Sequence, residues 1–160
     1  MYKYHVMLKD RIPYLERNSD TEYEEVVLDN PSKMQEYIEN VFHIKNAGEE
    51  HMVMLCLNGD LKPVSAFEVS HGSVQSTEAT PGEIFKMALL GGAEGIILAH
   101  NHTTGNPAPG KDDIKTLKDI KRSGKTPGIP LMDFIIFGIP SIPRLKWGIF
   151  KRKTDCVSLP

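Results

Sequence analysis

The residues with the clearest potential for chemistry are His100 and His102, two positions apart, and Asp113 further along the chain. Two imidazoles and one carboxylate form a complete three-ligand set for a catalytic divalent metal, with a fourth position left for water. The apolar run over residues 95–99 is typical of a buried strand. Because side chains at i and i+2 share a face of a strand, both imidazoles can point the same way. We therefore predict that the following Gly/Pro-rich loop returns the chain so that Asp113 completes a metal site.

Capping and hydrophobic patterns indicate the elements that must position these residues. A helix is predicted to begin at Pro31 with Asn30 as its N-cap. A second begins after Thr80, because Thr80-Pro81-Gly82-Glu83 has the pattern of a capping box. Further predictions are a third helix from Asp112 or Asp113 to about Arg122, a hairpin turn at Asn58-Gly59, and strands over residues 25–28, 51–57, 64–70, 95–99, 134–137 and 147–151.

The order of these elements predicts one α/β domain. Strands that alternate with capped helices favour two or three layers, and the hairpin makes the sheet a mixed one. The polar, weakly periodic residues 1–22 are expected to form an extended N-terminal arm. The domain itself is expected over residues 23–153, followed by a C-terminal tail over residues 154–160.

Composition and charge limit the function classes. The chain has 160 residues, of which 40% are hydrophobic and 25% charged, values that are ordinary for a globular domain. A net charge of −2 gives no overall attraction to nucleic acid or to membranes. No apolar run is long enough to span a bilayer, and the N-terminus lacks the apolar region of a signal peptide. Cys56 in an apolar strand and Cys156 in a polar tail do not suggest a disulfide framework, so we expect a cytoplasmic protein.

The motif resembles the signature of the RadC-like branch of the JAB/MPN/JAMM metalloprotease superfamily. That signature is a His-Asn-His-Pro-Ser-Gly core, a short Pro-containing loop, a Ser, two residues and an Asp. The resemblance extends over roughly residues 48–150, in the order of elements as well as in the motif. The matching residues are His100-Asn101-His102, Thr104 and Gly105 in the Ser-Gly slots, Pro107 and Pro109 in the loop, and Asp113.

The resemblance implies a fold, a cofactor and an activity. The fold would be a single MPN/JAB-like domain, a cytidine-deaminase-like mixed sheet flanked by helices. His100, His102 and Asp113 would bind Zn²⁺ together with a water molecule, and Glu50, just before strand 51–57, would be the general base. Zinc lowers the pKa of its bound water towards about 7, and a neighbouring glutamate takes the proton and later delivers it to the leaving amine. Glu49 is the alternative, although its side chain should point to the opposite face once the strand has begun.

The expected function is therefore zinc-dependent hydrolysis of peptide or isopeptide-like amide bonds in a peptide or protein substrate. The RadC-like name also implies an association with DNA repair. A second possibility is a metal-holding module with weak catalysis that binds a protein partner or nucleic acid.

Three departures from the family pattern bear on catalysis. Gly110 stands in the slot of the Ser that donates to the oxyanion, and losing one such donor lowers the rate by about 10²–10³-fold. Thr103 and Thr104 stand where the branch has Pro and Ser, and either hydroxyl could supply a donor. Asp133-Phe134 stands where the branch commonly has Asp-His. The pattern predicts a metal site but leaves open how well it hydrolyses amides.

Structural roles also fit several of these residues. The two motif histidines, taken alone, could be loop histidines that make ordinary hydrogen bonds. Asp113 could be an N-cap or first-turn acid, although Asp112 can take that role and leave Asp113 free to bind metal. The remaining histidines lack metal-ligand spacing and are expected at the surface or packed: His5, His43, His51 and His71.

A stripe of basic residues lies beside the predicted site. It fits a solvated helix face with cations near the helix C-terminus. Contact with phosphate groups is the functional alternative, and the absence of interleaved aromatic residues argues against a base-stacking surface. The stripe consists of Lys111, Lys115, Lys118, Lys121, Arg122 and Lys125.

Overall fold

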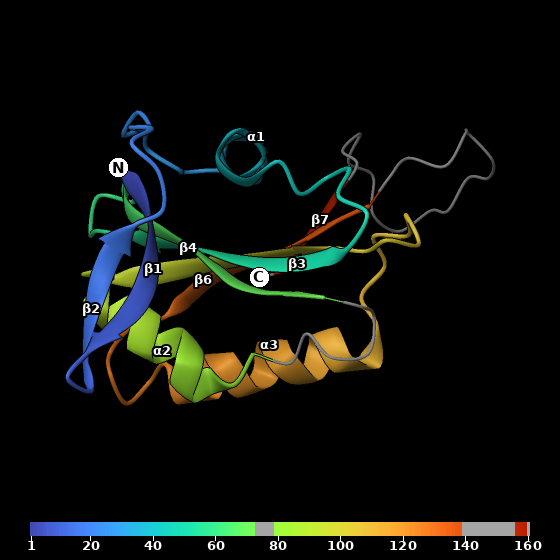
Figure 1. The fold of residues 1–160 in the computed structure, drawn as a ribbon. Coiled ribbons are helices and arrows are strands. Elements are labelled where there is room, and N and C mark those ends of the chain that lie inside the picture. Colours follow the sequence, from blue (N-terminus) through green and yellow to red (C-terminus); the bar gives the residue numbers. More distant parts are fainter. Residues whose placement is uncertain (73–78, 139–155, 160) are drawn as a thin grey trace.

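The computed structural model describes residues 1–72 and 79–138 and the backbone of strand 156–159. Figure 1 shows a twisted sheet with one helix over one face and two helices over the other. The strand order is β2-β1-β4-β3-β5-β6-β7. The elements are β1 (Tyr2–Lys9), β2 (Ile12–Arg17), α1 (Pro31–Phe42), β3 (Glu50–Leu57), β4 (Pro63–Gly72), α2 (Pro81–Leu90), β5 (Gly95–Asn101), α3 (Lys111–Ser123), β6 (Leu131–Phe137) and β7 (Cys156–Leu159).

The sheet is mixed, which confirms the predicted fold class. β1 and β4 run parallel, as do β5 and β6, while β3 runs antiparallel to both of its neighbours, β4 and β5. Helix α1 covers one face, and α2 and α3 cover the other (Figure 1). No helix in the described part of the chain is long and apolar enough to cross a membrane.

Two apolar cores lie on opposite faces of the central strands. Along β3, Val53 and Leu55 pack in the core on the α1 side, and Met54 and Cys56 pack in the core beside α2 and α3. This alternation follows from the two-residue period of a strand. In β5, Leu98 belongs to the core beside α2 and α3. His100 lies two residues after Leu98 on β5, and Glu50 lies four residues before Met54 on β3. Because side chains at even spacings share a face of a strand, both side chains point towards the face covered by α2 and α3.

The predicted helix starts are confirmed by their caps. The Asn30 side chain accepts a hydrogen bond from the backbone of Lys33 at 3.1 Å. At α2, the Thr80 hydroxyl accepts from the backbone of Glu83, and the Glu83 carboxylate accepts from the backbone of Thr80 at 2.9 Å. Both helices begin at a proline, whose missing N–H has no intrahelical partner to lose.

The hairpin between β3 and β4 is confirmed, but its turn is longer than a two-residue turn. The Asn58 N–H donates to the Lys62 carbonyl at 2.9 Å, and the Leu61 N–H donates to the Asn58 carbonyl at 3.0 Å. Leu61, with φ 59°, takes the left-handed conformation expected of a glycine. The Asn58 side chain accepts from the N–H groups of Asp60 and Lys62, and these bonds hold the turn.

The predicted strand over residues 25–28 is wrong. This segment is irregular and enters α1 directly. Leu28 is fully buried, and its N–H donates to the Leu61 carbonyl at 2.9 Å. The apolar residues of this segment therefore anchor the connection before α1 to the core and do not pair with another strand. The strand expected over residues 147–151 lies outside the described residues.

The first 22 residues, expected as an arm, contain the β1–β2 hairpin. β1 pairs with β4 only at Tyr2↔Ser65 and Lys3↔Ala66 and then pairs with β2. Met1 is buried, and its amino group donates to the Tyr23 carbonyl at 2.8 Å. The segment thus extends the sheet at one edge, while the boundaries at residues 22 and 153 stay predictions.

Candidate metal centre

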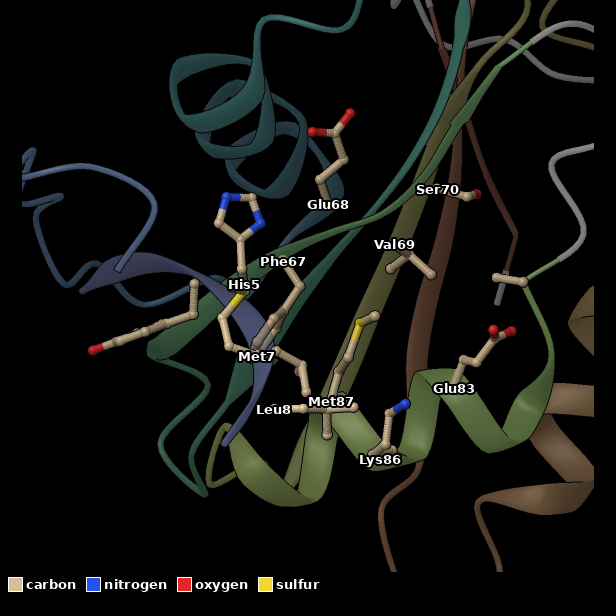
Figure 2. Close-up of a pocket in the computed structure, with 13 residues that line it drawn as sticks. His5, Met7, Leu8, Phe67, Glu68, Val69, Ser70, Glu83, Lys86 and Met87 are labelled. Carbon is tan, nitrogen blue, oxygen red and sulfur yellow. The ribbon is translucent and has the colours of Figure 1, made fainter. Parts of the chain in front are cut away.

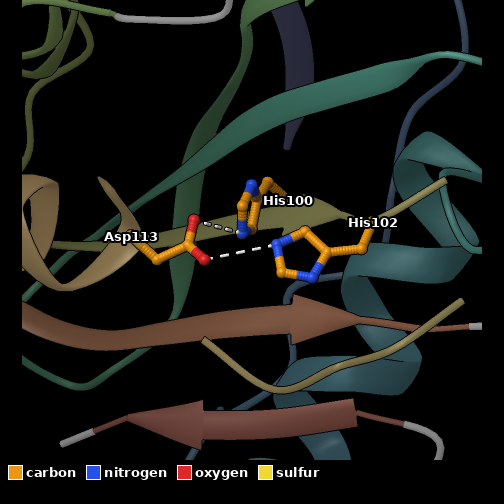
Figure 3. A group of neighbouring side chains, drawn as sticks. All are labelled: His100, His102 and Asp113. Carbon is orange, nitrogen blue, oxygen red and sulfur yellow. Dashed lines mark ion pairs between the residues drawn. The ribbon is translucent and has the colours of Figure 1, made fainter. Parts of the chain in front are cut away.

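The structure brings together the three residues predicted as metal ligands. Figure 3 shows His100 at the end of β5, His102 directly after it, and Asp113 in the first turn of α3. The His100 Nε2 atom lies 3.1 Å from Asp113 Oδ1, and His102 Nε2 lies 3.3 Å from Asp113 Oδ2. All three side chains are 15% exposed or less. Their ligand atoms lie within 4.8 Å of one another, so the group could hold a metal ion.

The loop after β5 orients the His102 ring. The backbone N–H of His102 donates to the Phe137 carbonyl of β6 at 2.8 Å. Gly105, with φ 78°, allows the loop to make a tight turn. The ring atom Nδ1 lies 2.7 Å from the Asn106 carbonyl oxygen, which can only accept, so Nδ1 carries a proton. In the neutral ring, the lone pair is then on Nε2, which faces Asp113. A hydrogen bond of this kind fixes ring orientation in many metal sites.

Asp113 serves both the helix and the site. Gly110 occupies the N-cap position of α3, and its N–H donates to Asp113 Oδ2 at 2.6 Å. We expected Asp112 to take the capping role and leave Asp113 free. Instead, the Asp113 carboxylate accepts the capping bond and faces both histidines, because a residue at the third helical position can reach back towards the N-cap.

The charges of the site shift the pKa values of two of its members. Burial raises the pKa of Asp113, but the two neighbouring imidazoles and the Gly110 N–H outweigh burial and hold that pKa well below its usual range. The Asp113 carboxylate raises the pKa of His102, against burial, which lowers it. The Asn106 carbonyl and the negative charge of Glu50 also raise the pKa of His102. Asp113 is therefore ionised, as a metal ligand must be.

The donor set fits a metal ion. The His100 Nε2 atom is buried, lies 3.1 Å from Asp113 Oδ1 and makes no hydrogen bond among the described residues. A bound cation would accept the lone pair of this atom. Two neutral imidazoles and one carboxylate with a position left for water are typical of catalytic zinc.

We expect the affinity for zinc to fall as the pH is lowered below neutral. Zinc binds only the neutral ring, so below the raised pKa of His102 a proton must leave the ring before zinc binds. This competition weakens zinc binding by about tenfold for each pH unit below that pKa. Competition with a chromophoric chelator at pH 7.5, 6.5 and 5.5 measures this. Equal affinity at all three values would contradict the assignment of His102.

The metal-free protein should show the opposite pH trend. The pKa of His102 is higher in the folded protein than in the unfolded chain, where a histidine has a pKa of about 6.5. Protonated His102 therefore stabilises the fold, and this contribution is complete below the unfolded pKa. It is lost as the pH rises through the folded pKa. Thermal unfolding of the metal-free protein between pH 6 and 8 checks the direction.

Glu50 lies beside this group. It is the first residue of β3, is half-buried, and pairs with Gly72 of β4. Its carboxylate is close enough to His102 for its charge to help raise that pKa. Glu49 precedes β3 and is exposed. The placement of Glu50 fits the predicted general base, and its catalytic role stays a prediction.

The residues that depart from the family pattern have distinct surroundings. Phe134 is fully buried, and its ring centroid lies 5.5 Å from that of His100, so a phenyl ring packs where the resemblance leads one to expect an imidazole. The Thr104 hydroxyl accepts from the Asn106 N–H at 3.4 Å. At Gly110, an added Cβ would meet Asp113 Oδ2 at 3.4 Å, an ordinary contact, so a larger residue fits there.

Two of the other histidines form a separate group with Glu68. His51 and His71 pair across β3 and β4, and their Nδ1 atoms lie 2.7 Å and 3.5 Å from Glu68 Oε1. These side chains are 25% and 65% exposed. His51 follows Glu50 and points to the opposite face of β3, as alternation requires. These histidines therefore lie outside the His100–His102–Asp113 group.

A hollow of about 630 Å³ lies between β1, β4 and α2. Figure 2 shows Met7 and Leu8 of β1 close to Met87 of α2. The hollow exists because β1 leaves β4 after two residue pairs. Its lining includes none of the three residues of the candidate metal group.

Comparison with known proteins identifies related sequences. The family model described as RadC-like JAB domain matches residues 28–144. A UPF0758 protein of Coprothermobacter proteolyticus is 35% identical over 117 residues, which cover 72% of this chain and 50% of the relative. One from Carboxydothermus hydrogenoformans is 35% identical over 109 residues, 68% of this chain and 47% of the relative. The chain thus spans about half the length of the curated relatives it matches.

Proposed function

Because this chain belongs to the RadC-like JAB domain family, we propose that it is a zinc-dependent metallohydrolase of the JAMM type that cleaves peptide or isopeptide-like amide bonds. The observation that carries the proposal is the convergence of His100, His102 and Asp113 on one point. The nearby carboxylate of Glu50 supplies the acid–base group that amide hydrolysis needs.

Each residue has a defined part in the proposed reaction. His100, His102 and Asp113 would hold the ion through two Nε2 atoms and a carboxylate oxygen. Zinc, when bound, would polarise the amide carbonyl and lower the pKa of a water molecule, so that this water can lose a proton and act as the nucleophile at neutral pH. Glu50 takes the proton of the attacking water and transfers it to the leaving amine, which departs as a neutral group. The Asn106 carbonyl keeps the His102 ring in place throughout.

Hydrolysis of model substrates tests this proposal. The zinc-loaded protein is incubated with a pool of fluorescence-quenched peptides that includes lysine isopeptide linkages. We expect cleavage that disappears when a chelator removes zinc and returns when zinc is added. If zinc-loaded protein leaves every amide in the pool intact, the proposed hydrolase activity is contradicted for these bond types.

Gly110 favours a second candidate function, a metal-holding module that binds a protein partner with little catalysis. A glycine has no hydroxyl to donate to the oxyanion, and this donor is worth about 10²–10³-fold in rate. Contact with nucleic acid is favoured by the lysines of α3, which are exposed, and an association with DNA repair is favoured by the family resemblance. The nucleic-acid contact, the DNA-repair association and the cytoplasmic location remain predictions.

We expect Gly110→Ser to raise kcat for amide hydrolysis by about 10²-fold without changing the zinc content. The backbone at Gly110, with φ −77° and ψ 179°, is extended and accepts any residue. Serine there adds a hydroxyl next to Asp113 and is also a favourable N-cap. Gly110→Ala is the matched control, since it adds the Cβ without the hydroxyl. Equal kcat values for the Ser and Ala variants would show that position 110 supplies no oxyanion donor.

A further inference from the structure

We propose that Asn101 is a positioning residue that clamps the backbone on both sides of Glu50 and so aims its carboxylate at the metal group. The inference rests on the proposed function, in which Glu50 is the general base. In the sequence, Asn101 is the middle residue of the His100-Asn101-His102 motif, and the motif predicts no separate role for its side chain.

The Asn101 side chain makes one hydrogen bond to each neighbour of Glu50. Its Nδ2 donates to the Glu49 carbonyl at 2.8 Å, and its Oδ1 accepts from the His51 N–H at 2.7 Å. Asn101 is only 1% exposed, so water has little access to these bonds. The two bonds fix the peptide groups before and after Glu50, and hence the direction of its side chain.

The course of β5 explains why a side chain is needed here. The pairing of β3 with β5 ends at Met52↔His100, although β3 begins at Glu50. Beyond that pair, β5 remains with β6 through Asn101↔Phe137, and the His102 N–H donates to the Phe137 carbonyl. Within residues 1–72 and 79–138, the start of β3 therefore has no backbone partner on its β5 side. The amide of Asn101 takes the place of that partner.

The chemistry of the two contacts requires an amide. The Glu49 carbonyl needs a donor and the His51 N–H needs an acceptor, and a planar side-chain amide offers one of each. Aspartate at position 101 would satisfy His51 but would face the Glu49 carbonyl with a second acceptor. Leucine has a similar volume and would satisfy neither. The series Asn, Asp, Leu thus removes the clamp in two steps.

The proposal predicts a catalytic defect without loss of metal. A catalytic group displaced by about 1 Å lowers the rate by about 10²-fold. We expect zinc-loaded Asn101→Leu to retain its zinc and its KM for the peptide pool while kcat falls by about that factor. Asn101→Asp is expected to lie between Asn101→Leu and the wild type.

Hydrogen exchange followed by NMR supplies a readout independent of activity. The His51 amide should exchange faster in Asn101→Leu, whereas Asn101→Asp, which keeps its acceptor, should protect it. Ser65→Ala is the matched control. Ser65 is 2% exposed, and its hydroxyl donates to the Gly91 carbonyl at 2.9 Å, so this variant also removes a buried side-chain-to-backbone bond.

The outcomes separate this inference from the proposed function. An unchanged kcat in Asn101→Leu, or an equal fall in Ser65→Ala, overturns the positioning role. If the wild-type protein cleaves nothing, the hydrolase proposal fails, and the clamp is judged by exchange alone. Faster exchange confined to residues 49–51 then supports it, and unaltered exchange at His51 overturns it.

Discussion

Glu50→Gln is expected to lower kcat for amide hydrolysis by about 10²–10⁴-fold while the protein keeps its zinc. Glutamine has nearly the same shape as glutamate but cannot take a proton from the attacking water. Glu50 contributes no atom to the His100–His102–Asp113 group, so the ligand set is unchanged. Single-turnover cleavage of the quenched peptides, together with the zinc content of the same samples, measures both parts of the expectation.

Glu49→Gln is the matched control for this prediction. It makes the same chemical change on the neighbouring, exposed residue and leaves the Glu49 carbonyl bonded to Asn101. We expect its kcat to be close to that of the wild type. If Glu50→Gln cleaves as fast as the wild type, or if Glu49→Gln is the impaired variant, the general base has been assigned to the wrong residue.

Zinc is expected to stabilise the folded protein strongly. A ligand that binds only the native state raises the free energy of unfolding by about 4 kcal/mol at a free concentration 1,000 times its Kd. Without a cation, the His100 Nε2 atom is buried and has no hydrogen-bond partner in the described part of the chain. Denaturant unfolding with and without zinc measures the difference, and His102→Ala should remove most of it.

His71→Ala is the control for the zinc-dependent stabilisation. It also removes one imidazole, but His71 is 65% exposed and pairs with Glu68 outside the candidate metal group. Its stabilisation by zinc should match that of the wild type. Equal stabilisation of His102→Ala and the wild type would mean that zinc binds elsewhere on the chain.

Local patterns predicted most of the fold. The caps at Asn30 and Thr80 marked helix starts that the structure confirms, because capping depends on residues within one turn. The apolar runs of β3, β5 and β6 were predicted because strands buried on both faces are continuously hydrophobic. Residues 26–28 are also a short apolar run, but they follow an irregular path into α1. Composition alone could not distinguish burial by a helix from pairing in a sheet.

The candidate metal group was predicted because its spacing is local to one strand, one loop and one helix start. The structure added contacts that depend on the course of distant segments. Asn101 bridges to residues about 50 positions earlier in the chain, and Phe134 meets His100 only because β6 lies beside β5. The capping bond from Gly110 to Asp113 was also missed, since Asp112 satisfied the same local pattern.

The zinc content of the purified protein tests the central claim most directly. The wild type, His71→Ala and His102→Ala are each incubated with zinc, exchanged into metal-free buffer and analysed by elemental mass spectrometry. We predict near-stoichiometric zinc in the wild type and His71→Ala, and little in His102→Ala. A wild type without zinc, or a His102→Ala variant that retains as much as the wild type, would contradict a metal centre at His100, His102 and Asp113.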